Sequence, residues 1–412
     1  MAEVVRMTGS WNDGLLVIAG AGALGAECRV EGERGELRTA TARNALTRCI
    51  ERWRPVLRLF ADDLMLNPFS VSKVLTKSWR YLPRLKGTLA HELIRSFSDE
   101  EVRAAAAAVT LYTGIPVEKT PAAQIIGLVA MLDEGFYLPV GGMGAIAHIL
   151  RDAYLNLGGE LRLNTRVERI QVKSGSTTGV LVRDGEPIES AIVVATPGAM
   201  QTFRHLIAPD EVPPSIMKRV GSASISHSAL GVQLGLANRL TRDAFAVNHI
   251  PLMPRQHEML VPQPGAIRWF MYTVPTTVLP ELAPENGSVL EMFVSVDPAR
   301  PVNAWDDRAA NDLAERAISA VRQHCELDIQ VKRILSPRTF AEQKHLYNGA
   351  LYGLSPATTF EHFRYRSGIE GLFLAGQTTW PGYGVGPALA SGLLSAESVL
   401  RSLADQQDLN AS

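Results

Sequence analysis

The chain has 412 residues, with 41 lysines and arginines against 42 aspartates and glutamates, and 46% of its residues are hydrophobic. A chain of this length forms more than one domain, or one domain with a large insertion. The balanced charge gives no basic surplus for nucleic acid, and neither an uninterrupted apolar stretch of about 18 residues nor a signal segment is present.

Cysteine and histidine are scattered along the chain. The three cysteines, Cys28, Cys49 and Cys325, form no CxxC pair and no metal-ligand spacing, which favours free thiols in a reducing cytoplasm. The nine histidines occur singly and without an HExxH motif, so we expect no metal site. The absence of a GxSxG motif disfavours a serine hydrolase.

The first 135 residues predict one or two strands followed by a mostly helical cap or substrate region. Apolar residues at helical spacing predict a helix over 41–60. The stretch 98–101 resembles a capping box, and it precedes an alanine-rich helix over 102–111 that ends at Gly114-Ile115-Pro116.

The pattern changes after Tyr137, where a glycine turn leads into a helix that runs to about Leu157 and stops at Gly158-Gly159. Alternating apolar residues then predict a series of strands, and Asp184-Gly185 reads as a hairpin turn. The predicted strands lie at 161–163, 167–172 and 180–182. The continuous apolar run 191–195 predicts a strand buried on both faces.

The second half begins with strand-like segments at 229–236, 267–274 and 289–296, followed by a helix over 306–325 and a strand at 329–334. It closes with a strand at 372–375, a glycine-rich turn and a helix over 387–403. Leu389, Leu393, Val399, Leu400 and Leu403 stripe one side of that helix. A strand-rich block between two α/β blocks predicts an α/β fold interrupted by a substrate domain.

The glycine-rich turn before the last helix is the strongest functional signal. Gly382, Gly384 and Gly386 would let the backbone approach a flat ligand. Pro387 suits the first turn of a helix, whose positive end would face negative charge, such as that on a reduced flavin near N1 and the C2 carbonyl. The alternative is a loop shaped only for packing.

Four segments carry a family pattern: Pro139-Val140-Gly141-Gly142, 164–170, 191–195 and 376–386. In this order they resemble the phytoene desaturase and carotenoid isomerase-like family of FAD-dependent oxidoreductases, within the amine-oxidase-like superfamily. The stretch 348–353 looks like the family's Gly-x-x-Gly loop. The resemblance implies FAD bound by a Rossmann-like domain in two parts, 136–215 and 336–412, around a substrate domain at 216–335.

The resemblance also implies roles for single residues. Val167 would meet the adenine through its backbone, Gly376 and Gln377 would lie beside the ribityl-pyrophosphate, and Gly384 and Val385 would lie beside the flavin ring, in the same turn as Gly382. Because the cofactor carries the chemistry in such sites, no catalytic acid or base is named. The turn reads Trp380-Pro381-Gly382 where the family usually has His-Pro-Gly, a departure that bears on a carotenoid substrate.

The family's front end is expected to be missing from this chain. Family members open with a strand, a GxGxxG turn and a helix. The GxGxxG motif occurs at 20–25. It is followed by a polar stretch that contains two glycines, and not by an amphipathic helix. Loss of this N-terminal dinucleotide-binding segment would weaken FAD binding by several kcal/mol.

Three functions stay open. The first is an FAD-dependent dehydrogenase or desaturase that moves a hydride from a small apolar, isoprenoid-like substrate to flavin N5, with a redox-neutral isomerase as a variant. The second is a cofactor-poor truncated homologue that binds an apolar ligand or partner. The third is a flavin amine oxidase with Trp380 and Tyr383 as its aromatic pair. A lipidic substrate would bring peripheral membrane contact to a cytoplasmic protein, and no pattern assigns an oligomeric state.

Overall fold

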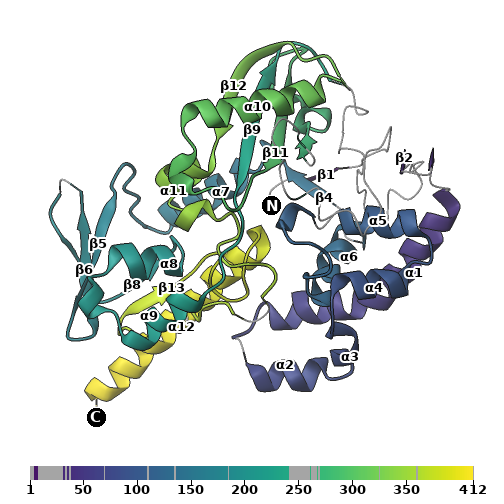
Figure 1. The fold of residues 1–412 in the computed structure, drawn as a ribbon. Coiled ribbons are helices and arrows are strands. Elements are labelled where there is room, and N and C mark those ends of the chain that lie inside the picture. Colours follow the sequence, from purple (N-terminus) through teal and green to yellow (C-terminus); the bar gives the residue numbers. More distant parts are fainter. Residues whose placement is uncertain are drawn as a thin grey trace. The chain divides into compact units, whose positions relative to one another are not determined.

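The structure is a computed structural model that describes residues 4–7, 31–32, 35–36, 39–68, 70–108, 111–133, 136–183, 185–240, 260, 267, 270–323, 325–358 and 361–411. The chain divides into two compact units. The first unit holds residues 1–57, 81–161 and 228–339, and the second holds 58–80, 162–227 and 340–412. Figure 1 shows the ribbon of both.

A block of helices in the first third of the described chain is followed by runs of strands interleaved with helices (Figure 1). The α-helices are α1 (Thr39–Arg58), α2 (Val71–Ser78), α3 (Leu82–Leu85), α4 (Leu89–Ser96), α5 (Glu100–Ala108), α6 (Ile125–Asp133), α7 (Gly144–Asn156), α8 (Ala199–Gln201), α9 (Pro214–Ser222), α10 (Asp307–Val321), α11 (Pro337–Gln343) and α12 (Val385–Ala411). The strands are β1 (Val4–Met7), β2 (Glu31–Gly32), β3 (Gly35–Glu36), β4 (Phe136–Pro139), β5 (Val167–Lys173), β6 (Ser176–Val182), β7 (Ile188–Glu189), β8 (Val193–Ala195), β9 (Ala229–Leu236), β10 (Phe270–Thr273), β11 (Ser288–Ser295), β12 (Ile329–Leu335) and β13 (Leu372–Leu374).

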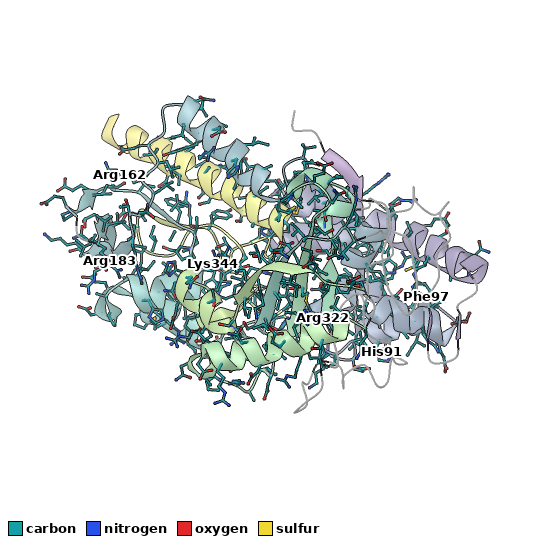
Figure 2. The ribbon with its side chains drawn as sticks, turned by 90° about the horizontal axis from the view of Figure 1, so that it is seen from above. His91, Phe97, Arg162, Arg183, Arg322 and Lys344 are labelled. Atoms are coloured by element: carbon teal, nitrogen blue, oxygen red, sulfur yellow. The ribbon has the colours of Figure 1, made fainter. Side chains whose placement is uncertain are left out.

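The helical core of the first unit forms around α1, as its apolar spacing predicts. Trp53 is fully buried and lies in one cluster with side chains from α4, α5 and α6. Phe97, which caps α4 and is labelled in Figure 2, is also fully buried in it. Burial raises the pKa of the Cys49 thiol to about 11, so this free cysteine stays protonated and inert.

An antiparallel sheet in the order β10-β11-β9-β12 forms the strand-rich part of the first unit. Strand β9 buries alternate residues, including Leu230, Val232 and Leu234, in one cluster with the buried face of α10. Asp306 caps α10 by accepting a hydrogen bond of 2.8 Å from the amide of Ala309. The strands and the helix predicted from 229 to 335 are therefore confirmed.

The second unit holds a three-stranded meander, β5-β6-β7, and a parallel pair, β8 and β13. Thr177 links them, because its hydroxyl donates to the carbonyl of Ala191 at 2.7 Å. Ile170 of the meander and Leu372 and Leu374 of β13 share one buried cluster. The two sheets of this unit are thus joined through both a hydrogen bond and a common core.

Four details differ from the sequence-based expectations. No strand forms at 161–163, where Leu161 and Leu163 are exposed. Strand β8 is not buried on both faces, because Val194 is 45% exposed. The capping residue of α5 is Asp99, whose carboxylate accepts from the amide of Val102 at 3.1 Å. The predicted leucine stripe of α12 faces outward, since the helix buries its serine-rich side instead, and Leu400 is 66% exposed.

Two expectations fall outside the described residues. These are the GxGxxG spelling at 20–25 and the Asp184 half of the hairpin turn. Within the described ranges, no helix is both long enough and apolar enough to cross a membrane.

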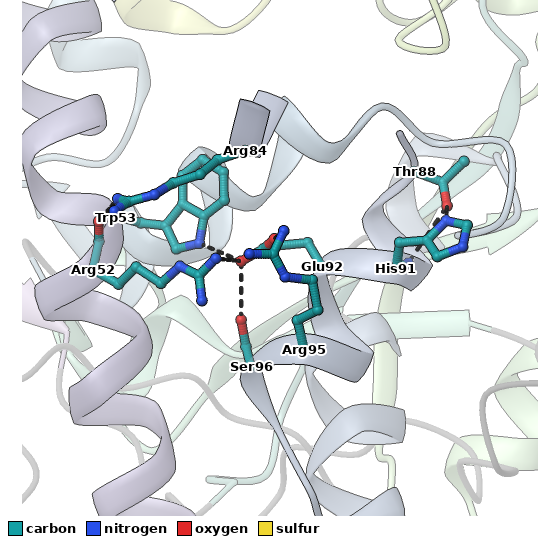
Figure 3. Close-up of polar contacts among 8 residues, drawn as sticks. All are labelled: Arg52, Trp53, Arg84, Thr88, His91, Glu92, Arg95 and Ser96. Atoms are coloured by element: carbon teal, nitrogen blue, oxygen red, sulfur yellow. Dashed lines mark hydrogen bonds and ion pairs between the residues drawn. The ribbon is translucent and has the colours of Figure 1, made fainter. Parts of the chain in front are cut away.

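A buried carboxylate holds α1 and α4 together in the first unit (Figure 3). Glu92 is 2% exposed and accepts hydrogen bonds from the indole of Trp53 at 3.0 Å and the hydroxyl of Ser96 at 3.2 Å. Arg52 and Arg95 lie 3.4 and 3.6 Å from its oxygens. The side chains of Arg52 and Arg95 are partly exposed and water can solvate them, so removing the carboxylate would cost most at the buried indole N–H of Trp53, which would lose its acceptor.

We predict that Glu92→Ala lowers the free energy of unfolding by about 2 kcal/mol, measured by chemical denaturation, because it leaves the buried indole N–H of Trp53 without an acceptor. His91→Ala is the matched control on the same helix, since His91 is exposed and contacts only the capping residue Thr88 in Figure 3. The control should change stability by less than about 0.5 kcal/mol. Equal effects of the two substitutions would contradict the structural role of Glu92.

Candidate functional site

The candidate site lies in the second unit, where β13 leads into the bend before α12. Strand β13 runs parallel to β8, and the amide of Ala375 donates to the carbonyl of Ala195 at 3.0 Å. The carboxyl ends of the two strands therefore meet at one edge, the edge at which open parallel sheets bind ligands. The bend contains Gly376, Gln377, Gly382 and Gly384, and Val385 begins the helix that follows it.

Ser391 fixes the start of this bend to α12. Its hydroxyl accepts from the amide of Gly376 at 2.7 Å and donates to the carbonyl of Ala388 at 2.7 Å. Ser391 is fully buried, so neither bond competes with bulk water. Gly376, the second residue after β13, is thereby held against the second turn of the helix.

The glycines of the bend serve different purposes. Gly384 has a φ of +98°, and a Cβ there would meet nothing closer than Pro387 at 3.6 Å. A Cβ on Gly386 would meet no atom within 4 Å. At Gly382 the φ is +127° and a Cβ would lie 2.5 Å from Nε2 of His362. Gly382 is therefore required by internal packing, whereas a side chain at Gly384 would meet only Pro387 at ordinary contact distance and one at Gly386 would enter open space.

The N-terminus of α12 offers hydrogen-bond donors beside that open space. At the start of the helix, the amide of Ala388 donates a hydrogen bond to the carbonyl of Gly384 at 2.9 Å. The amides of Val385 and Gly386 precede it, and Pro387 has no N–H. Val385 is 51% exposed. Open glycines beside an exposed helix N-terminus fit the face of a planar group that carries negative charge, so the bend fits a flavin.

The 348–353 loop packs against the bend. A Cβ on Gly353 would lie 2.5 Å from the methyl group of Thr378, so only glycine fits there, at a φ of +66°. The hydroxyl of Thr378 accepts from the amide of Ala199 at 2.9 Å. Loop, bend and the start of α8 are thus packed into one structure.

The aromatic rings near the bend pair in an unexpected way. Tyr383 lies against Tyr352, with ring centroids 5.1 Å apart and planes at 50°. Trp380, which the amine oxidase hypothesis pairs with Tyr383, is 5% exposed and donates its indole N–H to the carbonyl of Asn67 at 3.1 Å. The sequence places Tyr352 in the 348–353 loop but did not indicate that it pairs with Tyr383, because the two lie 31 residues apart and no local pattern joins them.

Val167 lies apart from the other proposed residues, at the start of β5, where it pairs with Val182. It belongs to the same unit as the bend. The glycine turn Pro139-Val140-Gly141-Gly142 belongs to the first unit, where Gly141 and Gly142 both adopt positive φ angles. Within the described part of the chain, no cluster of three or more histidine, cysteine, aspartate or glutamate side chains could hold a metal.

His362 packs against Gly382 of the bend, a contact that the sequence did not reveal. Both its ring nitrogens are buried without a hydrogen-bond partner among the described residues. Burial, and to a lesser extent the charge of Arg219, lowers the pKa of His362 to about 4. Arg219 also donates to the carbonyl of His362 at 2.6 Å. At neutral pH the imidazole is therefore uncharged, and it packs as a neutral ring against Gly382.

We predict that protonation of His362 destabilises the protein. Its folded pKa of about 4 lies below the ordinary value of 6.5, so the unfolded chain binds the proton more tightly between these pH values. The free energy of unfolding should fall by about 2–3 kcal/mol from this residue as the pH drops from 7 to 4. In His362→Asn this part of the pH dependence should vanish, as measured by urea unfolding at several pH values. The exposed-site variant His91→Asn should keep it, and a wild-type slope in His362→Asn would contradict the assignment.

The chain matches the family model described as flavin containing amine oxidoreductase over residues 35–400. This match covers most of the chain, so the chain belongs to that family. The resemblance to phytoene desaturase-like flavoproteins is thereby confirmed, and FAD is the cofactor that goes with this membership.

Two relatives illustrate the membership. The zeta-carotene-forming phytoene desaturase of Myxococcus xanthus is 27% identical over 342 residues, which cover 78% of this chain and 64% of the relative. The chloroplastic prolycopene isomerase of Daucus carota is 25% identical over 346 residues, which cover 79% of this chain and 54% of the relative. The chain therefore spans less than two thirds of either protein's length.

Solved structures agree on the fold. An oxidoreductase from Methanosarcina mazei matches with a TM-score of 0.57 at 13% identity, covering 97% of this chain and 82% of that one. An engineered putrescine oxidase matches with a TM-score of 0.57 at 12% identity, covering 97% and 83%. The predicted α/β fold class of FAD-binding oxidoreductases is therefore confirmed.

Proposed function

We propose that the chain is an FAD-dependent oxidoreductase that takes a hydride from a small apolar, isoprenoid-like substrate. Family membership supports the cofactor, and the names of the Myxococcus xanthus and Daucus carota relatives support a polyene-like substrate class. The single observation that carries the proposal is the open, glycine-lined bend in front of α12.

In this proposal Gly384 and Val385 lie beside the flavin ring, and Gly376 and Gln377 lie beside the ribityl-pyrophosphate. The amide of Gly376 already bonds Ser391, so its contribution would be close backbone approach. Val167 would meet the adenine through its backbone. Gly382 would act indirectly. A Cβ at this position would collide with His362, so the glycine is needed for that ring to pack against the bend.

Bound FAD supplies the hydride acceptor, flavin N5. The part of the protein is to orient the ring and to stabilise the charge that it gains. The positive end of α12, with the amides of Val385 and Gly386 directed outward from its first turn, favours an anionic reduced ring over a neutral one. No side chain of the bend needs to carry a proton for this role.

A flavin amine oxidase is the second candidate. The observation that favours it is the tilted pair of Tyr352 and Tyr383, which places two aromatic faces at the bend. The engineered putrescine oxidase shares the fold, although at 12% identity this likeness bears on the fold alone. If the substrate is lipidic, we also propose peripheral membrane contact.

Gly386→Leu tests the cofactor site with little risk to the fold. A Cβ at Gly386 meets nothing within 4 Å, so the free protein should fold normally, yet the larger side chain would occupy the space proposed for the ring. We expect FAD affinity, measured by the flavin absorbance retained on titration, to fall at least about tenfold.

Gly392→Leu is the matched control, because Gly392 lies in the same helix and also has open space at its Cβ. It should bind FAD as the wild type does. Equal affinities for Gly386→Leu and Gly392→Leu would contradict the proposed site.

Substrate assays separate the functions. An FAD-loaded protein that desaturates a C40 polyene such as phytoene supports the first, and peroxide release on addition of putrescine supports the second. A folded protein that gains no visible flavin absorbance with added FAD would instead support a cofactor-poor homologue that binds an apolar ligand.

A further inference from the structure

An arginine-lined pocket of about 330 Å³ lies beside the middle of α12 in the second unit. Arg364 and Arg366 come from the segment before β13, and Arg401 comes from α12. Glu397 is the single carboxylate among the lining residues. The pocket contains none of the residues proposed to contact FAD, and it touches the bend only through Trp380.

Neighbouring groups balance the positive charges of the three guanidinium groups to different extents. Arg401 lies 3.4 Å from Glu397, and this pair is mostly exposed. Arg366 donates from Nε to the neutral hydroxyl of Ser398 at 2.9 Å. Arg364 has no carboxylate within ion-pair distance among the residues that the structure describes. Two arginine charges thus face one pocket without a matching anion.

The surroundings add positive charge instead of removing it. Arg219 lies near Arg364, and after burial the repulsion from Arg364 is the next cause that lowers the pKa of Arg219. Glu361 attracts Arg219. Counting these neighbours, four guanidinium groups stand against two carboxylates, namely Glu361 and Glu397. Arg364, Arg366 and Arg401 are exposed, so water screens their mutual repulsion, but the excess of positive charge still favours a bound anion at the pocket.

The remaining lining indicates what else the ligand carries. Tyr365, Trp380, Leu394 and Pro68 give the pocket aromatic and aliphatic walls. The hydrogen bond to Ser398 uses only Nε of Arg366, which leaves its two terminal nitrogens as a fork. Such a fork fits the two oxygens of a carboxylate or phosphate group.

We propose that this pocket is a second ligand site, which binds a small organic oxyanion: a phosphate or carboxylate group attached to a planar or apolar body. Arg364 and Arg366 hold the oxyanion, Tyr365 and Leu394 contact the body, and Glu397 limits the affinity by partial neutralisation. The site is separate from the flavin bend and does not depend on the proposed oxidoreductase function.

Calorimetric titration of the full chain at constant ionic strength tests the site, with phenyl phosphate and inorganic phosphate as probes. We expect phenyl phosphate to bind, and to bind more tightly than inorganic phosphate because its ring contacts the apolar walls. No binding of phenyl phosphate up to about 10 mM, or tighter binding of inorganic phosphate, would overturn the proposal.

Charge variants give effects of opposite sign. Arg364→Gln and Arg366→Gln should each weaken binding of phenyl phosphate by about tenfold, because each removes a charge-assisted contact. Glu397→Gln should strengthen binding, because it frees Arg401 and removes the negative charge; the Glu397 side chain is partly exposed and isosteric with glutamine, so the substitution leaves the fold unchanged. Arg322→Gln is the control: it removes the same charge from an arginine at the end of α10, labelled in Figure 2, that does not line the pocket.

The proposal fails if Arg364→Gln and Arg366→Gln bind phenyl phosphate as Arg322→Gln does, or if Glu397→Gln weakens binding. Competition between phenyl phosphate and FAD would also overturn it, because the two would then share one site. Independent binding of both, with the flavin absorbance unchanged by phenyl phosphate, is the expected result.

Discussion

The hydrogen bond from the amide of Gly376 to Ser391 is the constraint on which the site depends. It ties the end of β13 to the second turn of α12, so the residues between them must form a closed bend. The left-handed conformations of Gly376, Gly382 and Gly384 follow from this closure, because an ordinary residue resists such angles. The helix N-terminus, the open glycines and the buried support of His362 all depend on the same tie.

The sequence predicted the elements of this region well and their environment less well. The apolar run before Gly376 and the last helix were recognised as a strand and a helix, as found, although the helix begins at Val385, two residues before the expected start at Pro387. The buried side of α12 was predicted wrongly, because hydrophobic periodicity assumes that leucines face the core. Here Ser391, Ser395 and Ser398 are buried instead. Serines at helical spacing in an apolar helix were the available signal.

The glycine pattern of the sequence could not show which glycines of the bend are required by packing and which have room for a side chain. Gly382 and Gly384 look alike in the sequence, yet a Cβ on Gly382 would collide with His362 whereas one on Gly384 would make only an ordinary contact with Pro387. The difference comes from a histidine 20 residues earlier, whose position only the folded chain reveals. The contact between Tyr352 and Tyr383 was missed for the same reason. Long-range partners of this kind have no local periodicity, whereas strands and helices do.

Hydrogen–deuterium exchange of the chain with and without FAD tests the central claim most directly, because it reads out the backbone amides of the bend themselves. We predict that FAD slows exchange in the peptides that span residues 376–388, and most strongly at Val385 and Gly386, whose amides precede the first bonds of α12. Tight FAD binding that leaves exchange in these peptides unchanged would contradict the account.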